Sequence, residues 1–235
     1  MDIIILLYDG FTALDFVGPF ESLSRFPGAN VKFVSKEKGL IEGEHKHLKI
    51  LTEYSIKDID RADILVVPGA TLGFLKAAQD PEILTWIRKI HETTKRTTSV
   101  CSGSVILAAS GILNGLQVTS HWAVYDQIQK LGAIPVAERI VRNGKIITSA
   151  GVSAGIDMGL HLAALEHGEE FAKMLQLVIE YDPRPDFDSG SVAKSAPSII
   201  EKAKNFLRSD IKRLSGGTFL SVLLVAIKLK FIHWL

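Results

Sequence analysis

The sequence has a single cysteine, Cys101, among 235 residues. A lone cysteine excludes an intramolecular disulfide, and a free thiol is typical of a reducing compartment, so we expect a cytoplasmic protein. Neither basic nor acidic residues are in excess, because 27 basic and 26 acidic residues give a formal net charge of +1. Without a basic stripe, nucleic acid is not expected as a partner.

We also expect neither a signal peptide nor a membrane-spanning segment. The N-terminal segment MDIIILLYDG has an acidic second residue, and its apolar run ends at Tyr8, which is too short for a signal peptide. Near the other end, the apolar stretch 219–227 is followed by Lys228 and Lys230 before it reaches the length that crosses a bilayer. We interpret this tail as a packed or interface helix, with a disordered or altered terminus or membrane contact as alternatives, and expect no membrane partner.

What is present is a hydrophobic content of 47%, enough for a large core, arranged in alternating strand-like and helix-like segments. Aliphatic or β-favouring runs predict strands over residues 3–7, 31–34, 63–67, 97–100 and 117–121, a hairpin over 139–148, and a loop or short hairpin over 36–47. Helical spacing predicts helices over 13–26 (interrupted at Gly18-Pro19), 81–93, 123–131, 149–168, 169–180 and 196–213. This alternation predicts an α/β fold with a mostly parallel sheet and helices on both faces.

The segment 97–112, TTSVCSGSVILAASGI, places Cys101 between a strand and a helix of small residues. A tight, small-residue turn between strand and helix is the form of a nucleophile elbow, which pushes the side chain at its apex out of the sheet. The free N–H groups of the following helix lead us to expect a lowered thiol pKa. The alternative is an inert, buried cysteine that packs as a small hydrophobe.

Five turns follow strands of the predicted sheet: 9–10, 68–70, 101–103, 120–121 and 150–151. Ligand sites of such sheets lie beyond the carboxyl ends of the strands, so their convergence favours an enzyme. Asp15 is the first candidate for an acid/base partner of Cys101, although Asp is also a common helix N-cap. Gly69, Ala70 and the Ser102 backbone could offer N–H groups to a developing negative charge.

Other candidates carry weaker signals. Ser102 offers a hydroxyl beside the thiol, or is simply a small elbow residue, and His121 ends a predicted strand where it could touch a substrate or be structural. His45 and His47 have no third metal ligand nearby in the sequence. Gly151, Gly155 and Gly159 recur every four residues, which favours a helix that approaches the sheet closely and not a dinucleotide-binding loop.

Five motifs together resemble the ThiJ/PfpI superfamily and, within it, the isonitrile hydratase group: LDFVGPFE (14–21), VVPGA (66–70), SVCSGS (99–104), VTSHW (118–122) and SAGVSAGIDMGL (149–160). The tail EYDPRPDFDSG (180–190) is also similar to that group, and the resemblance covers about residues 1–213 in matching order. The chain departs from the group at Ser102, where threonine is usual, and at Ala70, where glycine is usual.

The resemblance implies a flavodoxin-like α/β domain over residues 1–190, with 191–235 as its C-terminal helical extension, and a homodimer. It implies that Cys101 attacks the terminal carbon of an isonitrile, that Asp15 supplies the proton, and that water releases an N-substituted formamide. Ser102, Gly69, Ala70 and His121 would complete the site. The implied partner is a small-molecule substrate, and no metal or organic cofactor is implied.

Two other functions remain open on the sequence. Other branches of the superfamily act on reactive carbonyls as glyoxalases or deglycases. The sensor domains of AraC-type regulators also carry similar motifs, but those regulators append a DNA-binding helix-turn-helix pair, for which the segment after residue 213 is too short. A free-standing small-molecule or redox sensor is the non-enzymatic alternative.

Overall fold

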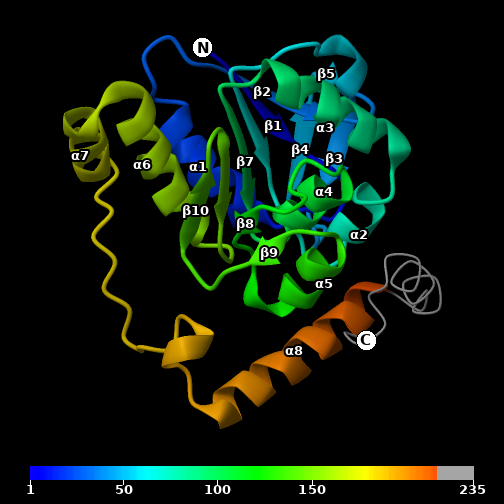
Figure 1. Ribbon diagram of the computed structural model, residues 1–235, viewed down its shortest axis with the longest axis vertical. Helices are drawn as coiled ribbons and strands as arrows, with labels where there is room; N and C mark the ends of the chain where they lie inside the picture. Colours follow the sequence, from blue (N-terminus) through cyan, green and yellow to red (C-terminus); the bar gives the residue numbers. More distant parts are fainter. Residues whose placement is uncertain (216–235) are drawn as a thin grey trace.

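The computed structural model describes residues 1–215, so the apolar tail considered above lies outside the described residues. A seven-stranded sheet runs through the centre of the molecule in the order β10-β11-β7-β6-β1-β2-β5 (Figure 1). All neighbouring strands are parallel except β10 and β11, which form the expected hairpin. The flavodoxin-like α/β fold with a mostly parallel sheet is thus confirmed.

The strands of this sheet are β1 (Asp2–Leu6), β2 (Asn30–Ser35), β5 (Tyr54–Ser55), β6 (Ile64–Val67), β7 (Arg96–Val100), β10 (Ile140–Asn143) and β11 (Ile146–Ser149). Two smaller sheets pair β3 (Gly39–Glu42) with β4 (Lys49–Thr52) and β8 (Gln117–Val118) with β9 (Ile134–Pro135). The segment interpreted as a loop or short hairpin therefore begins a hairpin that continues to Thr52.

Helices cover both faces of the sheet (Figure 1). One face carries α1 (Ala13–Leu23), α6 (Ala154–His167) and α7 (Glu169–Val178), and the other carries α2 (Phe74–Ala77), α3 (Pro81–Thr93), α4 (Gly103–Ala109) and α5 (Tyr125–Lys130). Along β1 the side chains alternate between two cores, with Ile3 and Ile5 in one and Ile4 and Leu6 in the other. All four are fully buried, and each contributes on the order of 1.5–3 kcal/mol.

Helix α1 differs from its prediction because it runs through Gly18-Pro19 without a break. Proline removes one backbone N–H, which leaves the carbonyl four residues earlier, that of Asp15, without its helical donor. Tertiary packing offsets this loss, since Phe16 and Leu23 of α1 are buried in the core. An intact first turn of α1 is what carries Asp15 into the protein interior.

The glycines of α6 permit close contacts with the sheet and, more tightly, with α1. A Cβ atom added at Gly155 would lie 2.9 Å from Cδ of Pro19 and 3.4 Å from Cγ1 of Val100, and one at Gly159 would lie 2.8 Å from Cβ of Ser22. Val100 ends β7, so the predicted approach to the sheet is found at Gly155, and Pro19 and Ser22 add a close approach between α1 and α6. Gly151 instead faces His121, whose Cδ2 would be 2.9 Å from an added Cβ.

The predicted strand that reaches His121 is shorter in the structure, because β8 ends at Val118. The next backbone N–H, that of Thr119, donates to the side-chain Oγ1 of Thr148 at 2.9 Å and not to a strand carbonyl. His121 therefore lies in the loop just before the short helical turn Trp122–Val124. This loop brings it to the same edge of the sheet as the other predicted site residues.

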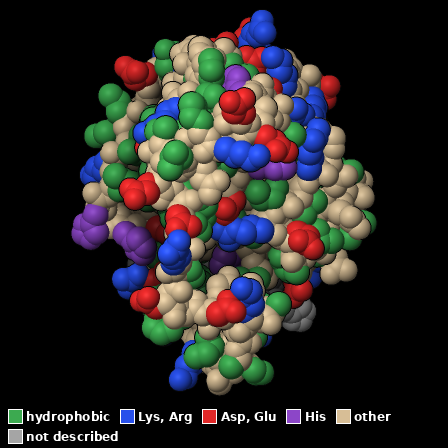
Figure 2. Space-filling model, turned by 90° about the vertical axis from the view of Figure 1, so that its left-hand side faces the viewer, with side chains coloured by type: hydrophobic (Ala, Val, Ile, Leu, Met, Phe, Trp, Pro, Cys, Tyr) green, Lys and Arg blue, Asp and Glu red, His purple; other side chains and the backbone are tan. Residues whose placement is uncertain are grey.

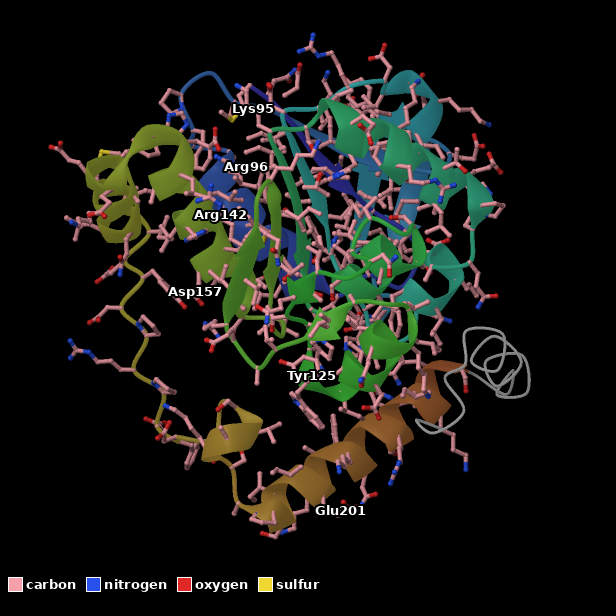
Figure 3. All side chains as sticks on the ribbon, viewed as in Figure 1. Lys95, Arg96, Tyr125, Arg142, Asp157 and Glu201 are labelled. Atoms are coloured by element: carbon pink, nitrogen blue, oxygen red, sulfur yellow. The ribbon has the colours of Figure 1, made fainter. Side chains whose placement is uncertain are left out.

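After α7, an exposed loop leads to α8 (Pro197–Ser215), which crosses the molecule beyond α5 (Figure 1). The C-terminal half of α8 meets the body, because Ile211 is only 1% exposed. Figure 3 shows Tyr125 at the start of α5 on the side that faces α8, and Glu201 on α8 itself. Within residues 1–215, no helix combines the length and apolarity needed to cross a membrane.

Candidate active site

The turn from β7 to α4 has the geometry of a nucleophile elbow. Cys101 at its apex has a φ of 58°, a left-handed conformation that residues other than glycine rarely adopt. The helix begins two residues later at Gly103, where an added Cβ would lie 2.1 Å from the carbonyl oxygen of Val67. The turn is therefore tight enough to require glycine at that position, as the small-residue pattern indicated.

The Gly103→Ala substitution is expected to destabilise the fold by about 3 kcal/mol, the upper end of the usual cost of overpacking. The reason is that the new methyl group meets backbone atoms of residues 67 and 68, which cannot move aside as a flexible side chain can. Denaturant unfolding measures the change. Gly190→Ala is the control, because nothing lies within 4 Å of a Cβ added there; equal stability of the two variants would contradict the expectation.

Hydrogen bonds on both sides hold the strained Cys101 backbone. Its N–H donates to the carbonyl oxygens of Ser149 at 3.2 Å and Ala150 at 2.8 Å. Its own carbonyl oxygen accepts from the hydroxyls of Ser104 at 3.1 Å and Ser120 at 2.8 Å. With these partners in place, the side chain of Cys101 has a fixed direction despite the unfavourable φ.

Asp15 lies in the first turn of α1 but does not cap it, since Thr12 is the N-cap residue. The carboxyl is fully buried, and its Oδ2 accepts from the backbone N–H of Gly69 at 2.9 Å. Among the described residues, its other oxygen, Oδ1, has no hydrogen-bond partner. Burial raises the pKa of Asp15 from 3.8 to about 7.

The Cys101 thiol lies close enough to the Asp15 carboxyl for each group to shift the protonation of the other. The expected lowering of the thiol pKa is not found. Burial of the sulfur, followed by the negative charge of Asp15, raises the pKa of Cys101 well above its ordinary value. The backbone N–H groups of Ser102 and Val152 act in the opposite direction and do not overcome these two effects.

Of the three N–H groups expected to form an oxyanion hole, those of Gly69 and Ala70 already have side-chain partners. The Gly69 N–H donates to Asp15, and the Ala70 N–H donates to the Oγ of Ser102 at 2.9 Å. The Ser102 hydroxyl in turn donates to the Ala70 carbonyl at 2.7 Å. Ala70 and Ser102 thus bind the 68–70 turn to the elbow, and Gly69 binds it to α1. The N–H groups that face the sulfur come from Ser102 and Val152.

A pocket of about 120 Å³ opens above Cys101. Side chains from distant segments surround it, namely Thr12, Glu44, Ala70, Thr71, Phe74, Ser102, His121, Ala123, Val124, Val152 and Leu207. Asp15 is not among the residues that line the pocket, and it lies next to the thiol in the protein interior. Among the described lining residues there is no lysine or arginine, so the pocket has acidic and apolar walls but no cationic one.

His121 lines the pocket as a neutral group. Burial lowers its pKa to about 4, and its Nδ1 accepts from the backbone N–H of Ala123 at 3.3 Å. Because Nδ1 is an acceptor, the proton of the neutral ring is on Nε2. His121 can therefore donate a hydrogen bond through Nε2 but has no free nitrogen with which to take up a proton.

Most of the pocket lining was not predicted from the sequence, namely Thr12, Glu44, Thr71, Phe74, Ala123, Val124, Val152 and Leu207. Glu44 lies in the polar segment interpreted as a loop, and Leu207 belongs to α8, far from every motif. The Thr12 hydroxyl donates to Oε1 of Glu44 at 3.0 Å, a contact between segments 32 residues apart. Within residues 1–215, no group of three or more His, Cys, Asp or Glu side chains could hold a metal ion.

The fold and the site together define a class of protein. Its members have a mostly parallel α/β fold and a cysteine in the turn between a strand and a helix, so that the sulfur lies at the carboxyl edge of the sheet. Residues 1–165 match the DJ-1/PfpI family. The chain belongs to this family, which confirms the ThiJ/PfpI resemblance.

Two relatives extend over most of the chain. It is 35% identical over 207 residues to an isonitrile hydratase from Pseudomonas putida, a match that covers 88% of this chain and 90% of that protein. A solved structure of a ThiJ/PfpI family protein from Pseudomonas syringae is 36% identical, with a TM-score of 0.82 and coverage of 92% and 90% of the two chains.

Two other relatives have lower sequence identity to this chain and match a smaller part of it. A deglycase from Thermococcus kodakarensis is 27% identical and matches 63% of this chain and 89% of its own length. A helix-turn-helix transcriptional regulator from Pseudomonas aeruginosa is 29% identical over 82% of this chain, which spans only 59% of that regulator.

Proposed function

We propose that this protein hydrates isonitriles to N-substituted formamides, with Cys101 as the nucleophile and Asp15 as the acid/base. The observation that carries the proposal is the buried pair of Cys101 and Asp15 at a small pocket that has no cationic lining residue. The match to an isonitrile hydratase over 88% of the chain supports it, whereas the deglycase match extends over 63%.

The character of the pocket supports a small, neutral substrate. Phe74, Val124, Val152 and Leu207 give it apolar walls, and Glu44 adds a carboxylate to the lining. An isonitrile has no net charge, and its substituent can be entirely apolar. An anionic substrate would instead meet carboxylates without a compensating cation, which is unfavourable in a partly buried site.

The first half of the reaction uses the proton that Asp15 and Cys101 can share. The Asp15 carboxylate takes the thiol proton as the sulfur electron pair forms a bond to the terminal carbon of R–N≡C. Asp15 then gives the proton to the same carbon, which leaves the thioimidate R–N=CH–S–Cys101. Backbone N–H groups of Ser102 and Val152 stabilise the sulfur while it is negative, and the His121 Nε2–H can donate to the substrate nitrogen.

The test of the proposal is formamide production from cyclohexyl isonitrile by the full chain. Sustained production would support hydration. If the protein does not convert the isonitrile but does consume methylglyoxal, the result would favour the deglycase alternative. If it consumes neither compound, the result would favour the sensor alternative.

The pH dependence of turnover follows from the pKa of Asp15. Only the ionised carboxyl can accept the thiol proton, and this carboxyl titrates at about 7. We therefore expect kcat/KM to fall about tenfold for each pH unit below that value and to level off above it, because the raised thiol pKa lies higher still. A pH–rate profile that is flat between about pH 5 and about pH 8 would contradict this assignment.

The proposal includes a homodimer in the cytoplasm. Exposed apolar side chains on the segment from α7 to α8 offer a surface for a second copy: Leu177, Val178, Phe187 and Phe206 are each at least 62% exposed. Figure 2 shows the side of the molecule that carries α7, where hydrophobic side chains lie among charged ones.

A further inference from the structure

Hydration has a second half, in which water must attack the thioimidate, and this step needs a group to take a proton from the water. Asp15 is poorly placed for it, because it is fully buried and does not line the pocket that would hold the water. His121 has its Nδ1 occupied and its Nε2 protonated. Among the described residues that line the pocket, Glu44 is the carboxylate.

Glu44 is held firmly at the pocket wall. Its side chain is only 10% exposed. Oε1 accepts from the Thr12 hydroxyl at 3.0 Å, and Oε2 accepts from the backbone N–H of Thr71 at 2.9 Å. Its own backbone N–H donates to the Phe11 carbonyl at 3.0 Å. Two other segments of the chain, residues 11–12 and Thr71, therefore fix both the position and the orientation of this carboxylate.

Glu44 also lies close enough to Asp15 to affect its protonation. Its negative charge is one of the influences that raise the pKa of Asp15 and that of the buried Tyr8. Each carboxylate oxygen has two lone pairs, and one protein donor at each leaves room for a water molecule. A fixed carboxylate beside an electrophilic carbon has the placement that a general base requires.

We propose that Glu44 is the general base that activates water for release of the formamide, an inference that rests on the proposed hydration of isonitriles. The water oxygen bonds to the thioimidate carbon while Glu44 takes one of its protons and passes that proton to the substrate nitrogen. The C–S bond then breaks, its electron pair leaves with sulfur, and the remaining hydroxyl proton passes to the thiolate. The products are R–NH–CHO and the free thiol.

The test separates the two halves of the reaction in the Glu44→Gln variant with cyclohexyl isonitrile as the probe. Glutamine keeps an oxygen for the Thr12 hydroxyl but is too weak a base to accept a proton. We expect steady-state turnover to fall by about 10²-fold or more, while the Cys101 adduct forms at nearly the wild-type rate and accumulates. Rapid quenching and intact-protein mass spectrometry detect this adduct as a gain equal to the mass of the isonitrile.

Glu42→Gln is the matched control, because Glu42 lies two residues away and pairs with the exposed Lys49 outside the pocket. It should turn over like the wild type and accumulate no adduct. Normal turnover by Glu44→Gln would overturn the inference, and so would adduct formation slowed as much as turnover, which is the result of a purely structural role. Absence of both adduct and turnover in the wild type would instead reject the proposed hydration itself.

Discussion

Replacing Cys101 by alanine is expected to reduce formamide production from an isonitrile by a factor on the order of 10³ or more. The sulfur forms the only covalent bond between protein and substrate in the proposed reaction, so no other group of the site can replace it. Steady-state formamide production by wild type and variant measures the loss. The same variant should show no mass gain with the probe, because the atom that would carry the adduct is gone.

Cys101→Ser is the companion variant, because it keeps a polar atom at the apex of the elbow. A hydroxyl is a far weaker acid than a thiol, so an Asp15 carboxyl that titrates at about 7 cannot activate it, and turnover should also be lost. Thermal unfolding of both variants checks that the elbow persists. Formamide production by the alanine variant at the wild-type rate would show that Cys101 is not the nucleophile.

The fold could be predicted from the sequence because its signals are local. Strands buried on both faces require continuous aliphatic runs, as in β1 and β6. Helix α3 begins at Pro81, a residue that is common at the first helical position, directly after its N-cap Asp80. The elbow could be predicted for the same reason, because its tight turn requires small residues that are seen directly in the sequence. At position 103 only glycine fits, since a Cβ atom there would lie 2.1 Å from the carbonyl oxygen of Val67.

The site could be predicted only in part because its electrostatics depend on contacts between distant segments. The pKa of the thiol is raised and not lowered because the fold buries the sulfur and, secondly, because α1 brings the negative charge of Asp15 close to it. The N–H groups of Gly69 and Ala70 are engaged by side chains from two other segments. Glu44 joins the pocket through the Phe11–Gly43 bridge, a pairing that leaves no periodic pattern in the sequence.

The Asp15→Asn variant is expected to lose turnover by about 10²- to 10⁴-fold, because an amide cannot take the thiol proton and return it to carbon. The loss should not result from a less acidic thiol. Removing the negative charge of Asp15 removes one cause of the raised pKa of Cys101, so alkylation by iodoacetamide should have its midpoint at a lower pH than in the wild type. A thiol that becomes more acidic while turnover collapses identifies proton transfer as the function of Asp15.

Stability gives an independent check on the Asp15→Asn variant. The folded-state pKa of Asp15 is raised above its unfolded value, so the native state binds this proton more tightly and loses stability as pH rises from about 4 to about 7. Asparagine has no charge to bury, and we expect it to raise the free energy of unfolding at pH values above about 7. Asp58 is the control of opposite sign: its pKa is lowered to about 2 by hydrogen bonds from Ser55, so Asp58→Asn should lower stability under the same conditions. An Asp15→Asn variant that is both inactive and less stable than the wild type at that pH would show that the carboxyl serves the fold, and its assignment as the acid/base would fail.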